Sequence, residues 1–154
     1  MRKDFTKEDI IKKHETNVKS AFTAYFLVFV LGLIYIVRYL IKQEFDFYFS
    51  LSFTDMMLKL ESSGEISKAI CIATIVVFAV IYIIPMILLL KNPKHLITAA
   101  VVYAFDFAVL FFSTFILFQK PQSNDWLIDV IIHLFVMIFL AAGIVSNGKL
   151  KKLK

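Results

Sequence analysis

Four long apolar stretches, separated by short polar breaks, constrain this chain more than any other feature. They cover residues 20–41, 67–90, 95–119 and 125–147. A helix of about 20 apolar residues crosses the ~30 Å hydrocarbon core of a bilayer, so each stretch is long enough to span a membrane. The sequence is 60% hydrophobic, whereas soluble domains are about 45–50% apolar. We therefore predict an all-α integral membrane protein of one domain, an up-and-down bundle of four transmembrane helices.

The remaining segments complete the expected organisation. Residues 1–19 are predicted to form a helical extension, because Thr6 and Asp9 have the spacing of a helix N-cap and its acidic third residue. Residues 42–66 form an amphipathic connection between the first two spans, and residues 148–154 form a basic tail. The other connections are short, so the last three spans are expected to be antiparallel neighbours.

The distribution of charge predicts the orientation of the bundle. Most of the 17 basic residues lie in residues 1–19, 91–94 and 148–154, which an up-and-down bundle places on one side. By the positive-inside rule that side is the cytoplasm, so both termini are expected there, in a multi-pass protein of a bacterial plasma membrane. The net charge of +5 follows from this rule. No nucleic-acid partner is expected, because no soluble face interleaves basic and aromatic residues.

The amphipathic connection supports two interpretations. Between residues 44 and 54, aromatic and polar residues alternate with the period of a strand. The same residues also form one stripe of a helix, which we favour because a lone strand at the membrane surface has no partner for its backbone groups. We expect this external segment to lie at the interface. Its candidate partner surface consists of Phe45, Phe47, Phe49, Phe53 and Met57.

One carboxyl group lies deep in the predicted bundle. Asp106 is about 20 Å from the external end of the third span, counted at ~1.5 Å per residue. Tyr25, Tyr82 and Tyr103 lie at a similar depth on three spans. Because an ionised carboxylate in hydrocarbon costs several kcal/mol, we expect Asp106 to be buried, protonated and hydrogen-bonded to at least one of these tyrosines. An amide can replace such an acid, so Asp106→Asn is expected to be tolerated.

A second polar group lies nearer the external surface. It consists of Arg38, Ser113, Asp129 and His133, all within about 10 Å of the external ends of their spans at ~1.5 Å per residue. Asp129 and His133 are four residues apart and share a helix face. Arg38 and Asp129 lie at nearly equal depth, so we predict an ion pair between the first and fourth spans. In addition, Pro85 is expected to free the backbone carbonyl of Ile81 beside the deep tyrosines.

Several chemistries have little support in the sequence. Cys71 is the only cysteine, which excludes an intrachain disulfide. His133 is the only histidine within a span, so no pair of axial haem ligands comes from one chain, and no metal or other cofactor is expected. Ser113, His133 and Asp129 have the residue types of a hydrolytic triad, but no loop supplies an oxyanion hole. We expect no catalytic residues, with an intramembrane hydrolase as the alternative.

Two functions remain open. The first is a non-enzymatic protein that acts through a membrane or extracytoplasmic partner, as an accessory subunit or an immunity-type binder, with the amphipathic connection as its docking surface. The second is a small homo-oligomeric ion channel or proton-coupled transporter in which Asp106 titrates. Besides the lipid bilayer, the expected partner is another membrane protein or further copies of the chain.

Overall fold

The computed structural model describes residues 6–42, 51–118 and 125–153. All of the secondary structure in these ranges is helical. The elements are α1 (Lys7–Lys42), α2 (Ser52–Ser62), α3 (Lys68–Lys91), the short 3-10 helix η1 (Pro93–His95), α4 (Leu96–Phe111), the π-helical turn η2 (Phe112–Leu117) and α5 (Asp125–Leu153). Four of the helical segments are long and apolar enough to cross a membrane, which confirms the prediction of an all-helical chain with four candidate spans.

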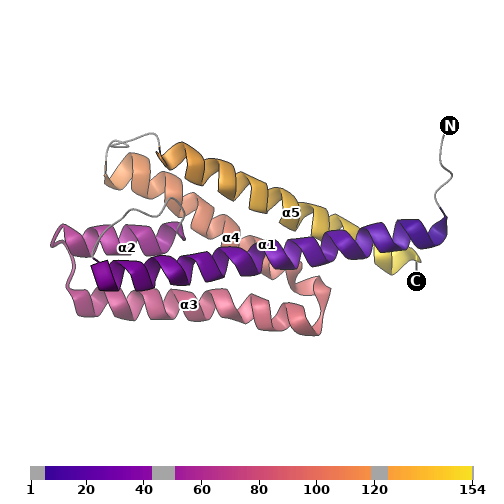
Figure 1. The fold of residues 1–154 in the computed structure, drawn as a ribbon, viewed down its shortest axis with the longest axis horizontal. Coiled ribbons are helices and arrows are strands. Elements are labelled where there is room, and N and C mark those ends of the chain that lie inside the picture. Colours follow the sequence, from indigo (N-terminus) through magenta and orange to yellow (C-terminus); the bar gives the residue numbers. More distant parts are fainter. Residues whose placement is uncertain (1–5, 43–50, 119–124, 154) are drawn as a thin grey trace.

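The four long helices lie side by side along one axis (Figure 1). The start of α1 and the end of α5 lie at one end of the bundle, which we call the terminal end, and α2 lies at the other, which we call the α2 end. α1 packs mainly on α5, α4 packs on α5, and α3 packs on α4 and α1. The last three spans are therefore neighbours in chain order, as their short connections predict.

The contact between α1 and α5 depends on a position without a side chain. A β-carbon built on Gly143 of α5 would lie 2.5 Å from the β-carbon of Ala21 on α1. Ala21 is fully buried. Small residues at such a crossing let two helix backbones approach closely. Close van der Waals packing of this kind is what holds apolar helices together in an apolar medium.

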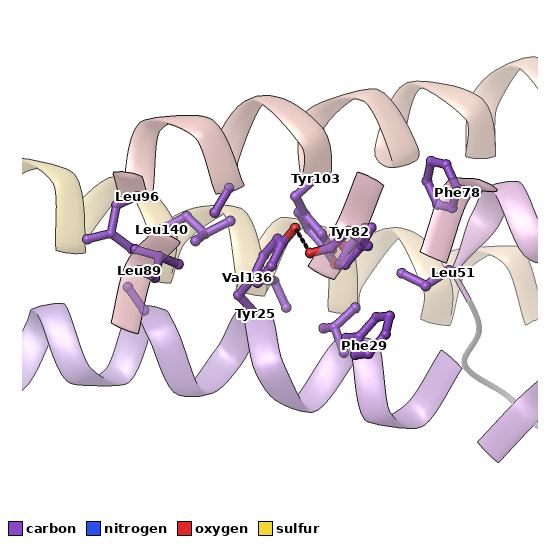
Figure 2. Close-up of a cluster of buried hydrophobic side chains, with 13 residues drawn as sticks. Tyr25, Phe29, Leu51, Phe78, Tyr82, Leu89, Leu96, Tyr103, Val136 and Leu140 are labelled. Carbon is purple, nitrogen blue, oxygen red and sulfur yellow. Dashed lines mark hydrogen bonds between the residues drawn. The ribbon is translucent and has the colours of Figure 1, made fainter. Parts of the chain in front are cut away.

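The middle of the bundle is built from stacked tyrosines (Figure 2). The rings of Tyr25 and Tyr82 stack with their centroids 4.8 Å apart. The Tyr25 hydroxyl donates a hydrogen bond to the backbone carbonyl of Tyr82, 3.0 Å away. We expected Pro85 to free the Ile81 carbonyl, and the carbonyl that takes the tyrosine hydroxyl is the next one along the helix. The bulk of a proline ring disturbs the preceding turn, and neighbouring helices supply the donors that such a turn lacks.

α2 confirms the helical interpretation of the connection for residues 52–60 and corrects its position. Phe53 stacks on Phe78 of α3 with a centroid distance of 4.3 Å, and Met57 is buried. Leu51, which precedes the helix, is buried against Gly32 of α1. This segment is therefore inserted among the long helices and does not lie on their outer surface. Met57 and Leu58 are buried and Phe53 and Met56 are half-buried, and burial between helices removes more apolar area from water than a flat interface does.

Gly143 and Gly148 provide a matched test of the α1–α5 contact. Gly143→Ala is expected to lower the free energy of unfolding by about 1–3 kcal/mol, the usual cost of overpacking. Gly148→Ala adds the same methyl group where nothing lies within 4 Å, so it should leave stability unchanged or raise it by up to about 1 kcal/mol through helix propensity. Thermal unfolding in detergent micelles measures both variants. Equal melting temperatures would mean that the close approach at Gly143 is not required.

Candidate functional site

Helix α2 begins inside the bundle, where Asp106 of α4 caps its N-terminus. The residue at the N-cap position is Leu51, whose side chain makes no capping hydrogen bond. The backbone N–H of Ser52 donates to Asp106 Oδ2 at 3.1 Å, and that of Phe53 donates to Oδ1 at 2.9 Å. Asp106 is fully buried. A carboxylate at this place satisfies two of the N–H groups that every helix start leaves unpaired and interacts favourably with the helix dipole.

His133 of α5 completes the site. Its Nε2 lies 3.3 Å from Asp106 Oδ2 and 3.1 Å from Ser52 Oγ. Its Nδ1 lies 2.8 Å from the backbone carbonyl oxygen of Asp129. A carbonyl oxygen only accepts hydrogen bonds, so Nδ1 carries a hydrogen and Nε2 faces the carboxyl group. A hydrogen bond between Nε2 and Asp106 then needs one further proton, which either partner can carry, and the pair is neutral overall in both cases.

Two aromatic rings of α4 hold the imidazole of His133. Tyr103 and Phe107 each stack on it with a centroid distance of 5.3 Å. The two residues are one helical turn apart, so α4 presents both rings and Asp106 toward α5. Stacking fixes the plane of the imidazole, and His133 is fully buried. The ring therefore points its Nε2 at the start of α2 with little freedom to turn away.

Hydrogen bonds to α1 and α3 hold the rest of α2. The Tyr35 hydroxyl donates to Asp55 Oδ1 at 2.7 Å, and the Tyr39 hydroxyl donates to Glu61 Oε2 at 2.6 Å. On the α3 side, Cys71 Sγ donates to the backbone carbonyl of Met57 at 3.4 Å. Together with Asp106 and His133, these contacts join α2 to all four long helices.

The expected tyrosine partners of Asp106 are close to it but do not bind it. Tyr25, Tyr82 and Tyr103 are buried. Among the described residues, however, the hydroxyls of Tyr82 and Tyr103 have no hydrogen-bond partner, and that of Tyr25 binds the Tyr82 carbonyl. The predicted Asp106–tyrosine hydrogen bond is therefore wrong for this part of the chain. The backbone N–H groups of α2 and the His133 imidazole occupy the carboxyl oxygens instead.

The outer polar group divides in the structure. His133 belongs to the site of Asp106, which corrects its assignment to the outer polar group. Ser113 is buried and donates to the Leu110 carbonyl at 3.1 Å, at the start of the π-helical turn η2. Depths counted at ~1.5 Å per residue assume an α-helix throughout, and the π-helical turn has more residues per turn. The Arg38–Asp129 ion pair stays a prediction.

The residues of the candidate partner surface divide into two groups. Phe53 and Met57 of the candidate partner surface face the inside of the bundle. Phe45, Phe47 and Phe49 lie outside the described residues. Sequence reasoning missed Ser52 as a member of the site. A signal existed, because Ser52 and Asp55 have the spacing of a capping box, but Asp55 binds Tyr35 and Lys59, and the cap comes from another helix.

The geometry of the site differs from that of a hydrolytic triad. In a hydrolytic triad the carboxylate binds one imidazole nitrogen and the serine binds the other. Here Asp106 and Ser52 both lie at Nε2 of His133. Within residues 6–42, 51–118 and 125–153, no group of three His, Cys, Asp or Glu residues is arranged to hold a metal ion.

In comparisons with known proteins, no protein-family model, no curated protein and no solved structure matches this chain. The contacts within the chain therefore carry the functional argument.

Cys71 offers a native reporter for the cap. It is the only cysteine of the chain, it is buried, and it contacts α2. Asp106→Leu leaves two buried N–H groups unpaired, at about 1–3 kcal/mol each, and Asp106→Asn keeps an acceptor for only one of them. We therefore expect maleimide labelling of Cys71 to be at least ~tenfold faster in the Leu variant, since ~1.4 kcal/mol is tenfold in an equilibrium constant, and intermediate in the Asn variant.

Tyr103→Phe is the control for this experiment. Its hydroxyl has no partner among the described residues, so its removal should leave the labelling rate unchanged. A tolerated Asp106→Asn together with a faster rate in Tyr103→Phe would restore the tyrosine partner expected from the sequence and contradict the cap.

Proposed function

We propose that the protein is a non-enzymatic interaction protein of a bacterial plasma membrane, an accessory subunit or an immunity-type binder. The observation that carries this proposal is the use of the polar groups inside the bundle. Asp106 and His133 are both 0% exposed and hold the start of α2 at Ser52, which is 3% exposed. Polar groups committed to the fold leave the outer surfaces of the molecule as the place for binding.

The α2 end offers a defined surface for a partner. The last turn of α2 and the turn into α3 expose a group of polar residues, which we call the cap surface, namely Lys59, Ser62, Ser63, Gly64 and Glu65. Gly64 has a φ of 80°, which glycine adopts without strain and which closes this turn. Because α2 is fixed from four sides, the cap surface is preorganised, and binding there costs less conformational entropy.

The orientation belongs to the same proposal. The terminal end carries most of the basic residues of the chain, so the positive-inside rule assigns it to the cytoplasm. The cap surface then faces the outside. Phe45, Phe47 and Phe49 precede α2 in the chain, and we propose that they contribute to the same docking region.

Photo-crosslinking in native membranes tests this proposal. A photoreactive amino acid at Glu65, on the cap surface, should form an adduct with a distinct membrane or extracytoplasmic protein when the chain is expressed at its natural level. The matched control places the same amino acid at Val77, which is 59% exposed on a span and should contact lipid. If Glu65 yields only lipid and self-contacts, the docking proposal fails.

One observation favours a second candidate, a small channel or a proton-coupled carrier. Asp106 and His133 share one site between α4 and α5, 3.3 Å apart, at the end of a short helix. Gain or loss of a proton at this site would change the hydrogen bonds that cap α2. Proton binding would then be coupled to the position of α2. Water has to reach the site for this to occur. Four helices leave little room for a wet path, so this function calls for several copies of the chain.

Flux measurements in proteoliposomes test the carrier. Proton-driven flux is expected to be lost in Asp106→Asn and in His133→Gln, because both remove the shared proton. Glu65→Gln is the control, since it neutralises an exposed carboxylate outside the site. Absence of flux in the parent protein, or equal flux in all variants, would remove this candidate.

A further inference from the structure

The terminal end carries a groove that neither function uses. Here α1 and α5 continue past the turn between α3 and α4 (Figure 1). Ser146 joins the two helices, because its hydroxyl accepts from Asn17 Nδ2 at 3.0 Å and lies 3.2 Å from His14 Nδ1. Beside this contact, α1, α5 and the turn at Pro93 enclose an open groove of about 600 Å³.

The lining of the groove has two chemical parts. Val18, Leu150 and Pro93 supply an apolar floor, and Lys19 and Lys151 supply two ammonium groups, one from each helix. Glu15 also lines it. Further exposed lysines on the same two helices, Lys12, Lys13, Lys149 and Lys152, keep the surroundings positively charged.

The groove also lies where the apolar spans end. Leu90, just before the turn, and Ile97, just after it, are 73% and 60% exposed, as expected for side chains that face lipid. Pro93 of the apolar floor lies three residues after Leu90 and four before Ile97, where the exposed apolar side chains give way to Lys91 and Lys94.

We propose that this groove binds one anionic phospholipid of the adjacent leaflet. The phosphate lies between Lys19 and Lys151, and the upper part of an acyl chain lies on Val18, Leu150 and Pro93. Basic pockets between helices at the membrane surface are typical sites for anionic headgroups. An acidic protein segment would match the lysines but would not use the apolar floor or its position beside the ends of two apolar spans.

Thermal unfolding of the full chain in neutral detergent tests the site. Phosphatidylglycerol is titrated into the parent protein and should raise the melting temperature, whereas phosphatidylcholine and inorganic phosphate should not. In the double variant Lys19→Gln with Lys151→Gln, the half-maximal lipid concentration should rise roughly tenfold or more, because both basic contacts with the headgroup are lost. The charge-matched control, Lys12→Gln with Lys13→Gln, removes two lysines that do not line the groove and should respond like the parent.

A rescue variant guards against misfolding. Lys19→Arg with Lys151→Arg keeps both charges and should keep the response to phosphatidylglycerol. Equal losses in the two glutamine variants would mean diffuse attraction to the lysines, and equal stabilisation by inorganic phosphate would mean a free anion. An equal effect of phosphatidylcholine, or tighter binding of an acidic peptide than of the lipid, would likewise overturn the proposal.

Discussion

The unpaired N–H groups at the start of α2 are the constraint on which the rest of this structure depends. A helix that begins inside an apolar bundle has no water for these groups, and each one left unpaired costs about 1–3 kcal/mol. Leu51, at the N-cap, cannot supply an acceptor. Asp106 of α4 accepts hydrogen bonds from two of these N–H groups, one at each carboxyl oxygen. His133 of α5 places its Nε2 beside the same carboxyl group. The buried N–H groups of α2 and the buried carboxyl group of α4 thus satisfy each other's hydrogen-bonding requirements.

The same contact gives opposite requirements to the two candidate functions. A docking protein needs α2 to stay in place, because the cap surface is preorganised only while the helix is held from four sides. A proton-coupled carrier needs α2 to move when the shared proton leaves or when a second one arrives. The complete burial of Asp106 and His133 favours the first, since no exposed face of the pair is available for exchange with water in this arrangement. The aromatic rings stacked on His133 add to this, because they hold the imidazole in the plane that serves the cap.

Sequence reasoning succeeded where one segment determines its own structure. The second span was expected at residues 67–90 and α3 covers Lys68–Lys91, because a long apolar run with polar ends specifies a spanning helix without further information. Residues 52–60 are helical as the apolar stripe suggested. Reasoning failed where two distant segments decide together. The hydrogen-bond partner of the Ser52 N–H lies 54 residues away in the chain. Depths counted along each span assign His133 and Asp106 to different levels, although the two side chains are in contact. The tyrosines lie near Asp106 as predicted, but the backbone donors of α2, which the sequence places at the membrane interface, occupy its oxygens.

α1 links the two ends of the molecule through small residues. Ala21 approaches Gly143 of α5, and Gly32 receives the side chain of Leu51, with a built β-carbon 2.8 Å from it. The two positions are three turns apart at about 3.6 residues per turn, so they lie on one side of the helix. A larger residue at Gly32 would displace Leu51, which directly precedes the capped N–H groups, and would act on Asp106 without touching it. The absence of a side chain at Gly32 therefore leaves room for Leu51, the residue that directly precedes the capped N–H groups.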